Sequence, residues 1–262
     1  MKTIGITYAG HCVALPDHPD YAKFYRKLAS GTWEPRTFET LSRNLGADTV
    51  YVDIGAWIGV TPMWAAQLAK AVIAVEPDPR CIKILRSLAA GCGNVTIIEG
   101  ALAADESVVI NAVDGFGSSE TTILDIGNGG HIKVQGISLT GIMRHAAGSP
   151  AFVKIDIEGY EYLIAGEFAA LRNYPLCGIQ IAIHPQLYEK TLKGNRPWRR
   201  IRTAWATWRL AKSIGGNLPG PAIARFGSLS SYVIRGILLR RKPKGADLVY
   251  ERLGSIRSRP LP

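Results

Sequence analysis

The chain has 262 residues, of which 47% are hydrophobic and 20% are charged. These values are ordinary for a globular protein, and a chain of this length buries enough surface to fold without disulfide bonds. No hydrophobic run reaches the ~18 residues of a membrane-spanning helix, and the N-terminus lacks the hydrophobic stretch of a signal peptide. The four cysteines form no CxxC pair. We therefore expect a cytoplasmic protein with reduced cysteines.

Charge is distributed unevenly along the chain. Residues 1–189 contain 14 Lys and Arg against 19 Asp and Glu, whereas residues 190–262 contain 17 against 2. The net charge of +15 in the C-terminal part indicates an anionic neighbour, which is a phosphate group, a nucleic acid or a membrane surface. A basic face that is simply solvated is the alternative.

Residues 1–48 predict a leading region with a hairpin and two helices. The hairpin is expected over Ile4–Tyr8 and His11–Leu15, and the helices over Tyr21–Leu28 and Pro35–Leu45.

Residues 49–189 alternate between strand-like and helix-like segments. Five short runs rich in Val and Ile stop at turn residues and predict buried parallel strands. These runs are Val50–Ile54, Val72–Val75, Val95–Ile98, Phe152–Ile157 and Ile179–Ile183. Hydrophobic residues at helical spacing predict helices over Trp64–Lys70, Arg80–Ala90 and Glu161–Leu171. Two additional strands are expected at Val108–Ala112 and His131–Val134. The alternation predicts an α/β fold with a doubly wound sheet.

Residues 190–262 form a third, basic and Trp-rich region. Trp198–Lys212 predicts a helix on which three Trp and one Ile, at spacings of three and four, form a single stripe. Such a helix is typical of a membrane interface and would place the protein peripherally at an inner membrane. The alternative is that the stripe packs on the sheet. Tyr232–Leu239 and Asp247–Glu251 predict a closing antiparallel pair of strands.

The turn after the first core strand predicts a loop that binds a nucleotide-like ligand. Asp53, Gly55 and Gly59 form the pattern D-x-G-x-x-x-G, with Ala56 and Trp57 inside the turn. Glycine allows a tight turn and a close approach of the backbone, and the following helix offers free N–H groups. Because the spacing is not that of a pyrophosphate loop, we expect the loop to hold an amino-acid group, with Asp53 attracting its ammonium. A purely structural turn is the alternative.

The ends of the next two strands complete this binding site. Glu76 stands 21 positions after Gly55, where a carboxylate accepts hydrogen bonds from both hydroxyls of a ribose. Pro77 then turns the chain. Gly100 and Ala101 follow the third strand and offer small side chains and backbone amides to an adenine.

A cluster of charged residues follows the fourth and fifth strands and predicts the catalytic residues. Period-two alternation places Lys154, Asp156 and Glu158 on one side of the strand end, where ligands of open α/β sheets bind. His184 ends the fifth strand, and a neutral imidazole is a natural base. We expect Asp156 and His184 to remove a proton, and Asp156 with Glu158 or Glu161 to offer ligands to a divalent cation. A structural Lys–Asp pair is the alternative.

Together these motifs resemble the FkbM family of methyltransferases that depend on S-adenosyl-L-methionine (SAM), over roughly residues 31–190. The most specific block is K-x-D-x-E-G-x-E, from Lys154 to Glu161. The other matching segments are 52–59, 74–77, 101–103, 117–119 and 138–139. The resemblance implies a Rossmann-like class I methyltransferase fold, with a mostly parallel seven-stranded sheet and helices on both faces. It also implies O-methylation of a hydroxyl on a sugar, a glycolipid or polysaccharide, or a polyol natural product.

Three positions depart from the family pattern. Trp57 stands where the family usually has Asn, Thr140 where it often has Asp, and Ala182 where it often has Glu. The last two leave open a non-catalytic module with the same fold that binds a glycan or a membrane.

Two other enzyme classes fit less well. A nucleic-acid methyltransferase would explain the basic, Trp-rich region, but amino methylation of bases uses an Asn/Asp-Pro-Pro-aromatic motif where this chain has Asp156-Ile157-Glu158-Gly159. A nicotinamide dehydrogenase would need GxGxxG spacing in the first turn.

Overall fold

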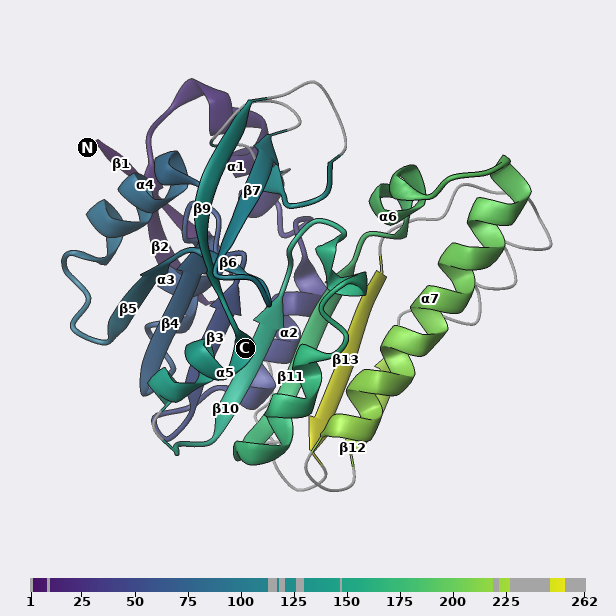
Figure 1. The fold of residues 1–262 in the computed structure, drawn as a ribbon. Helices are drawn as coiled ribbons and strands as arrows, with labels where there is room; N and C mark the ends of the chain where they lie inside the picture. Colours follow the sequence, from purple (N-terminus) through teal and green to yellow (C-terminus); the bar gives the residue numbers. More distant parts are fainter. Residues whose placement is uncertain are drawn as a thin grey trace.

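The centre of the computed structural model is a seven-stranded sheet in the order β12-β13-β11-β10-β3-β4-β5 (Figure 1). The structure describes residues 2–8, 10–112, 117, 121–125, 130–146, 148–218, 222–226 and 246–252. Five strands run parallel: β3 (Val50–Ile54), β4 (Ala71–Glu76), β5 (Val95–Glu99), β10 (Ala151–Ile155) and β11 (Leu176–Ile183). β13 (Ala246–Arg252) pairs antiparallel with β11, and β12 (Ala222–Phe226) antiparallel with β13. The predicted α/β class is confirmed, with a mixed sheet.

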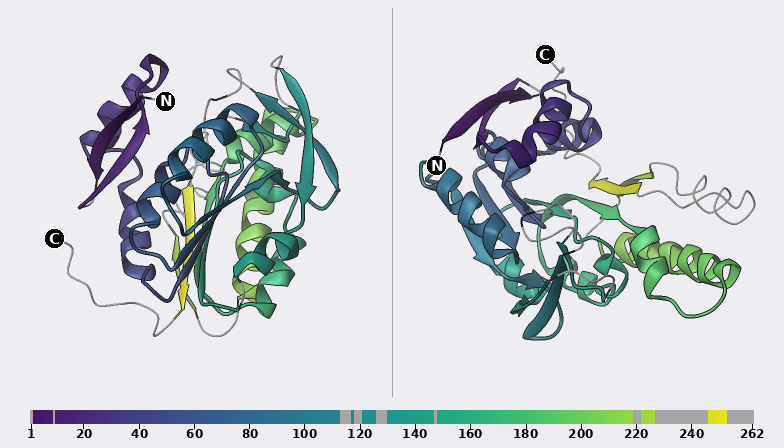
Figure 2. Two further views of the ribbon diagram at one scale, coloured as in Figure 1. Left: turned by 90° about the vertical axis from the view of Figure 1, so that its left-hand side faces the viewer. Right: turned by 90° about the horizontal axis from the view of Figure 1, so that it is seen from above.

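Helices cover both faces of this sheet because alternate strand residues point to opposite sides. Tyr51 and Val72 face one core, which includes α2 (Pro35–Asn44), α3 (Val60–Ala65) and α4 (Pro79–Ala89). Val52 and Ile73 face the other core, which includes α5 (Leu139–Met143), the 3-10 helix η4 (Glu167–Asn173) and α7 (Arg196–Asn217). The view from above shows α2 and α7 on opposite sides of the sheet (Figure 2).

The N-terminal region packs onto the first of these helical layers. It consists of β1 (Thr3–Tyr8), β2 (His11–Pro16), the 3-10 helix η1 (Pro19–Tyr21) and α1 (Ala22–Ala29). Tyr8, Leu15 and Leu28 are buried in the same core as Trp64. The indole Nε1 of Trp64 also donates a 3.0 Å hydrogen bond to the carbonyl of Tyr8. The region therefore belongs to the core and lies beside the carboxyl ends of the strands.

The remaining elements are a small second sheet and three short connecting helices. A small sheet contains β6 (Ala101–Leu102), β7 (Ser107–Ala112), β8 (Thr121–Thr122) and β9 (His131–Ile137). The connecting helices are η2 (Arg144–Ala146), η3 (Tyr160–Tyr162) and α6 (Pro185–Thr191).

Three predicted elements differ from the structure. The helix expected at Trp64–Lys70 ends at Ala65, because residues 66–70 turn the chain into β4. The α-helix expected at Glu161–Leu171 is two 3-10 segments, since the Glu161 carboxylate accepts the N–H groups of Ile157 and Gly159 and holds the chain in a loop. Tyr232–Leu239 lies outside the described residues, and β12 is the strand that pairs with β13.

Glu251 on β13 forms hydrogen bonds with two residues of helix α2. It is fully buried, and its Oε1 accepts hydrogen bonds from Asn44 Nδ2 at 2.8 Å and from Arg43 Nε at 3.3 Å and Nη2 at 3.2 Å. A buried carboxylate is tolerated because these donors replace water.

We expect Glu251→Gln to lower the free energy of unfolding by about 2 kcal/mol, because it leaves the Arg43 cation without its buried counter-charge. Urea unfolding followed by circular dichroism measures this change. Glu39→Gln is the matched control, since Glu39 is a half-exposed partner of the same Arg43 and its loss should cost less than ~0.5 kcal/mol. Equal effects of the two variants would contradict the assignment.

Candidate functional site

Two adjoining cavities open at the carboxyl edge of the parallel strands. The smaller cavity is lined by the ends of β3, β4 and β5, including Gly55, Trp57, Glu76, Pro77, Gly100 and Ala101. The larger cavity has a volume of about 1150 Å³, and its lining includes Lys154, Glu158 and His184. Four residues line both cavities and mark where they meet: Gly55, Trp57, Asp156 and Glu158.

The glycine loop after β3 is shaped by the protein's own packing. Gly55 has φ +88° and Gly59 has φ +92°, in the left-handed region that favours glycine. A Cβ on Gly55 would collide with the carbonyl oxygen of Asp156, and one on Gly59 would lie 2.5 Å from Leu85 Cδ1. The loop therefore lies directly against the end of β10. Ala56 lines the larger cavity, whereas Gly59 lines neither.

Glu76 lies at the end of β4 with its carboxylate in the smaller cavity. Oε2 accepts the N–H of Trp57 and Oε1 accepts that of Asp78, both at 2.8 Å. Burial raises the pKa of Glu76 to about 7, although these two backbone donors oppose the shift. The carboxylate is thus fixed in orientation, with its further lone pairs free for a ligand.

Lys154 lies between two carboxylates on neighbouring strands. Its Nζ is 3.1 Å from Asp156 Oδ2 and 3.8 Å from Asp53 Oδ1. Burial alone would lower the pKa of Lys154, but Asp156, Asp53 and Glu34 outweigh it and raise the pKa well above its usual value. Asp53 is fully buried, accepts a hydrogen bond from Thr61 and lines neither cavity. Asp53 therefore has a structural role: it pairs with Lys154 and bonds Thr61, and it is not exposed to either cavity.

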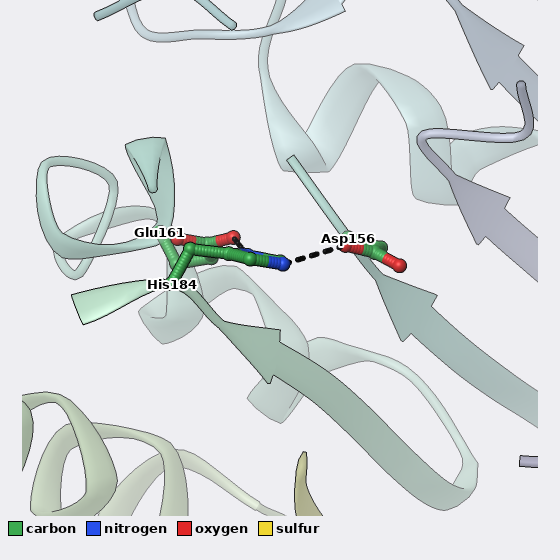
Figure 3. Close-up of side chains that lie close together, drawn as sticks. All are labelled: Asp156, Glu161 and His184. Carbon is green, nitrogen blue, oxygen red and sulfur yellow. Dashed lines mark hydrogen bonds and ion pairs between the residues drawn. The ribbon is translucent and has the colours of Figure 1, made fainter. Parts of the chain in front are cut away.

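His184 lies among three carboxylates, of which Figure 3 shows Asp156 and Glu161. Its Nδ1 is 3.1 Å from Glu161 Oε1, and its Nε2 is 3.7 Å from Asp156 Oδ1 and 3.5 Å from Glu158 Oε2. Burial would lower the pKa of His184, but the hydrogen bond that its Nδ1 donates to Glu161 and the charges of all three carboxylates raise the pKa to about 10. His184 follows β11 directly, as expected, but its raised pKa favours the protonated ring over the expected neutral imidazole.

The same cluster provides a geometry that could hold a divalent cation. One ligand atom each from Asp156, Glu161 and His184 lie within 4.8 Å of one another. The set contains Asp156 and Glu161, which are among the expected ligands, and adds His184, whereas Glu158 does not belong to it.

Glu34 and Asp247 are residues of this site that sequence reasoning missed. Glu34 precedes α2 and lines the larger cavity with Lys154 and Asp156. Burial, followed by the charges of Asp156 and Asp247, raises the pKa of Glu34 to about 7 against the opposing charge of Lys154. Asp247 lies on β13 opposite Ala182, and burial followed by the charge of Asp156 raises its pKa. No motif surrounds either residue, so only the folded chain brings them here.

Backbone strain is concentrated in this cavity. Glu34, Trp57 and Glu158, with φ of 42°, 50° and 50°, are the positive-φ residues other than glycine among the described residues. All three line the larger cavity. Strained residues that gather in one place mark a functional site, because the rest of the structure must stabilise them.

Trp57 shows what the departure from Asn accomplishes. Asn adopts the left-handed region more readily than Trp does, so the contacts of the Trp57 side chain must offset the cost of its backbone conformation. Its indole Nε1 donates to the carbonyl of Gly117 at 3.1 Å, and its ring contacts Tyr21 and Phe24 edge-on, with centroids at 5.8 and 4.8 Å. Trp57 therefore joins the glycine loop to the N-terminal region.

Comparison with known proteins agrees with this geometry. The family model of the FkbM methyltransferase domain matches residues 53–199. No curated protein sequence matches the chain. In structure the chain is similar to the fibrillarin pre-rRNA processing protein of Methanococcus jannaschii, with 13% identity, 79% of this chain and 68% of that chain covered, and a TM-score of 0.44. It is also similar to an rRNA methylase of Streptococcus thermophilus, with 10% identity, coverage of 83% and 95%, and a TM-score of 0.45. Since the family model spans more than half of its length, the chain belongs to the FkbM family of SAM-dependent methyltransferases.

Proposed function

We propose that this enzyme transfers the methyl group of SAM to a hydroxyl oxygen of a sugar or a related polyol. The observation that carries the proposal is the junction of the two cavities at Asp156, with carboxylates and aromatic rings on the wall of the larger one. Carboxylates accept hydrogen bonds from hydroxyls, and aromatic rings pack against the apolar faces of a sugar. Tyr21, Phe24 and Trp33 provide such rings beside Glu34.

We assign the smaller cavity to SAM. In this assignment Glu76 accepts the ribose hydroxyls, Gly100 and Ala101 border the adenine, and Gly55 and Trp57 approach the methionine part. When bound, SAM supplies a methyl group activated by its sulfonium. The protein's part is to position two reactants and to remove one proton.

Asp156 is the residue that we expect to orient the acceptor. Lys154 occupies its Oδ2, whereas Oδ1 is buried and accepts no hydrogen bond from the described residues. Burial raises the pKa of Asp156, but Lys154 and His184 outweigh it and hold the pKa below its usual range. An ionised Oδ1 at the junction can accept the hydrogen bond of a hydroxyl and direct its oxygen toward the methyl group.

Glu34 is better suited than His184 to take the proton. A base works best when its pKa lies near the working pH, which holds for Glu34 at about 7, while His184 at about 10 already carries its proton. Bound SAM would supply the methyl group and would be left as a neutral thioether, while the Glu34 carboxylate would accept the proton that the acceptor hydroxyl gives up. Ala182 leaves a small side chain where the family often has Glu, and Glu34 with Asp247 supplies carboxylates nearby.

The acceptor class can be tested with SAM that carries a deuterated methyl group. Purified enzyme is incubated with separated extracts of glycolipid, polysaccharide, small polyol and RNA, and products are analysed by mass spectrometry. The proposal expects label in a methyl ether of a glycan or polyol fraction. Label confined to RNA would contradict it, and SAM binding without label in any fraction would favour a non-catalytic module.

The pH dependence of SAM binding should report on Glu76. Because the pKa of Glu76 is raised to about 7, the carboxylate that accepts the ribose hydroxyls is lost as pH falls below 7. Calorimetry should show affinity falling by up to about tenfold from pH 8 to pH 6, with a smaller change in Glu76→Gln, which also reveals any ionisation of SAM itself. Glu99→Gln, on the neighbouring strand, should behave as wild type. Identical pH profiles for wild type and Glu76→Gln would remove Glu76 from the cofactor site.

Asp156→Asn should separate chemistry from cofactor binding. The amide keeps the shape but loses the charge that orients the acceptor, so kcat should fall by ~10²–10⁴ while calorimetry shows SAM binding retained. Loss of SAM binding with a normal rate per bound cofactor would contradict this role. A chelator added to wild type should leave the rate unchanged, because Lys154 and protonated His184 already neutralise the carboxylates. A chelator-sensitive rate restored by Mg²⁺ would instead assign the cluster to a cation.

Glu34→Gln should change the pH profile as well as the rate. If Glu34 takes the proton, kcat/KM of wild type rises through about pH 7 as the carboxyl ionises, and the Gln variant loses this rise together with ~10²-fold or more in rate. Glu39→Gln, an exposed neighbour on α2, is the control. A retained rise near pH 7 in Glu34→Gln would move the base to another residue.

A further inference from the structure

Helix α7 has two faces of different character. The buried face is made of small and aliphatic residues: Thr203, Ala204, Thr207, Leu210, Ala211 and Ile214. The opposite face carries Trp198, Ile201, Trp205 and Trp208, which are 61%, 45%, 57% and 50% exposed. We call these four residues the Trp stripe. The alternative that the stripe packs on the sheet is therefore wrong.

Exposure of this kind is unusual within the protein. Of the seven large hydrophobic residues that are exposed in the described part of the chain, four belong to the Trp stripe, and the others lie apart on β1, β7 and the loop after η3. Contiguous exposed hydrophobic surface marks an interaction site. The stripe runs along a helix at the edge of the molecule, beside β13 (Figure 1).

Basic residues accompany the stripe. The helix contains six basic residues and no acidic one: Arg196, Arg199, Arg200, Arg202, Arg209 and Lys212. Arg209 lies over the ring of Trp205 at 4.6 Å, and Lys212 over that of Trp208 at 5.1 Å. Arg202 and Arg209 follow Trp198 and Trp205 by four positions and so lie on the same side of the helix. The aromatic rings therefore face outward together with Arg202, Arg209 and Lys212.

We propose that the Trp stripe docks on an anionic lipid bilayer, with α7 lying parallel to the membrane surface. Trp rings prefer the depth of the lipid headgroups, and Arg beside them pairs with lipid phosphate. No described helix is long and apolar enough to cross a bilayer, so the contact is peripheral. A second copy of the chain fits this face poorly, because two helices with six cations each and no anion would repel.

The docking face follows the methyltransferase site closely in the sequence. His184 precedes α6, and α7 begins at Arg196, only a few residues after α6 ends. If the proposed function holds, an acceptor linked to a lipid would be presented beside the larger cavity. Membrane binding itself needs neither SAM nor acceptor, so its failure can be told apart from failure of methyl transfer.

Co-sedimentation of the full chain with vesicles tests the proposal. Vesicles of phosphatidylcholine alone are compared with vesicles that also contain phosphatidylglycerol, across a salt series. We expect binding that requires phosphatidylglycerol and weakens with salt, since exposed charges are screened. No binding to anionic vesicles at low salt would overturn the proposal. Binding to single-stranded RNA without binding to vesicles would also overturn it, and would assign the face to nucleic acid.

Matched variants separate the stripe from general surface effects. Trp205→Ala/Trp208→Ala should weaken vesicle binding by about tenfold or more, whereas Ile4→Ala/Val109→Ala, which removes exposed hydrophobic residues elsewhere, should not. Unfolding curves and SAM affinity should stay those of wild type in both. Equal loss in the two double variants would contradict a specific stripe.

The basic residues can be tested in the same way. Arg202→Gln/Arg209→Gln should weaken binding to anionic vesicles by about fivefold for each charge removed. The control, Lys83→Gln/Lys133→Gln, removes two exposed charges from other elements and should have a much smaller effect. If the control loses as much affinity, the net charge of the protein, and not α7, directs binding.

Discussion

One buried cation organises this protein: the ammonium of Lys154, held between Asp53 and Asp156. Lys154 and Asp53 are register partners on the adjacent strands β10 and β3, and Asp156 follows on the same face of β10. Removing the ammonium would leave Asp53 buried without a counter-charge and Asp156 with His184 alone, at a cost of several kcal/mol. The D-x-G turn and the K-x-D block, a hundred residues apart in sequence, are therefore two halves of one structure, which the close packing of Gly55 against Asp156 joins a second time.

The N-terminal region completes the site by contacts to residues that are themselves strained. Trp57 adopts a left-handed conformation in which its N–H reaches Glu76 while its ring meets Tyr21 and Phe24. Glu34 adopts the same conformation at the start of α2. Burial of the surrounding aromatic rings offsets the free-energy cost of these strained backbone conformations. The larger cavity is consequently formed both by the family core and by a region that precedes the matched domain.

Features that depend on neighbouring residues along the chain could be predicted from the sequence. Five parallel strands and the residues at their ends followed from short Val- and Ile-rich runs, because side-chain alternation and the rule for ligand sites in open sheets act locally. The sequence was insufficient where the outcome depends on distant charges. The raised pKa of His184 depends on Glu161, Asp156 and Glu158, and the raised pKa of Glu34 depends first on its burial and then on the charges of Asp156 and Asp247. The prediction of an α-helix around Glu161 was wrong for a similar reason. The Glu161 carboxylate accepts the backbone N–H groups of Ile157 and Gly159.

Helix α7 shows why a hydrophobic pattern alone does not say which face is buried. Spacing of three and four places its Trp residues on one side, which ordinarily identifies the core-facing side. Here close approach to the sheet layer selects Thr203, Ala204 and Thr207 instead, whose small side chains fit beneath η3, where the Tyr162 hydroxyl lies 3.0 Å from Thr207 Oγ1. The Trp rings therefore stay exposed and contribute no buried hydrophobic surface to the stability of the fold. A helix that buries its small residues and exposes its largest ones has a surface that packing within the fold does not explain. The cations beside the rings favour an anionic partner for that surface.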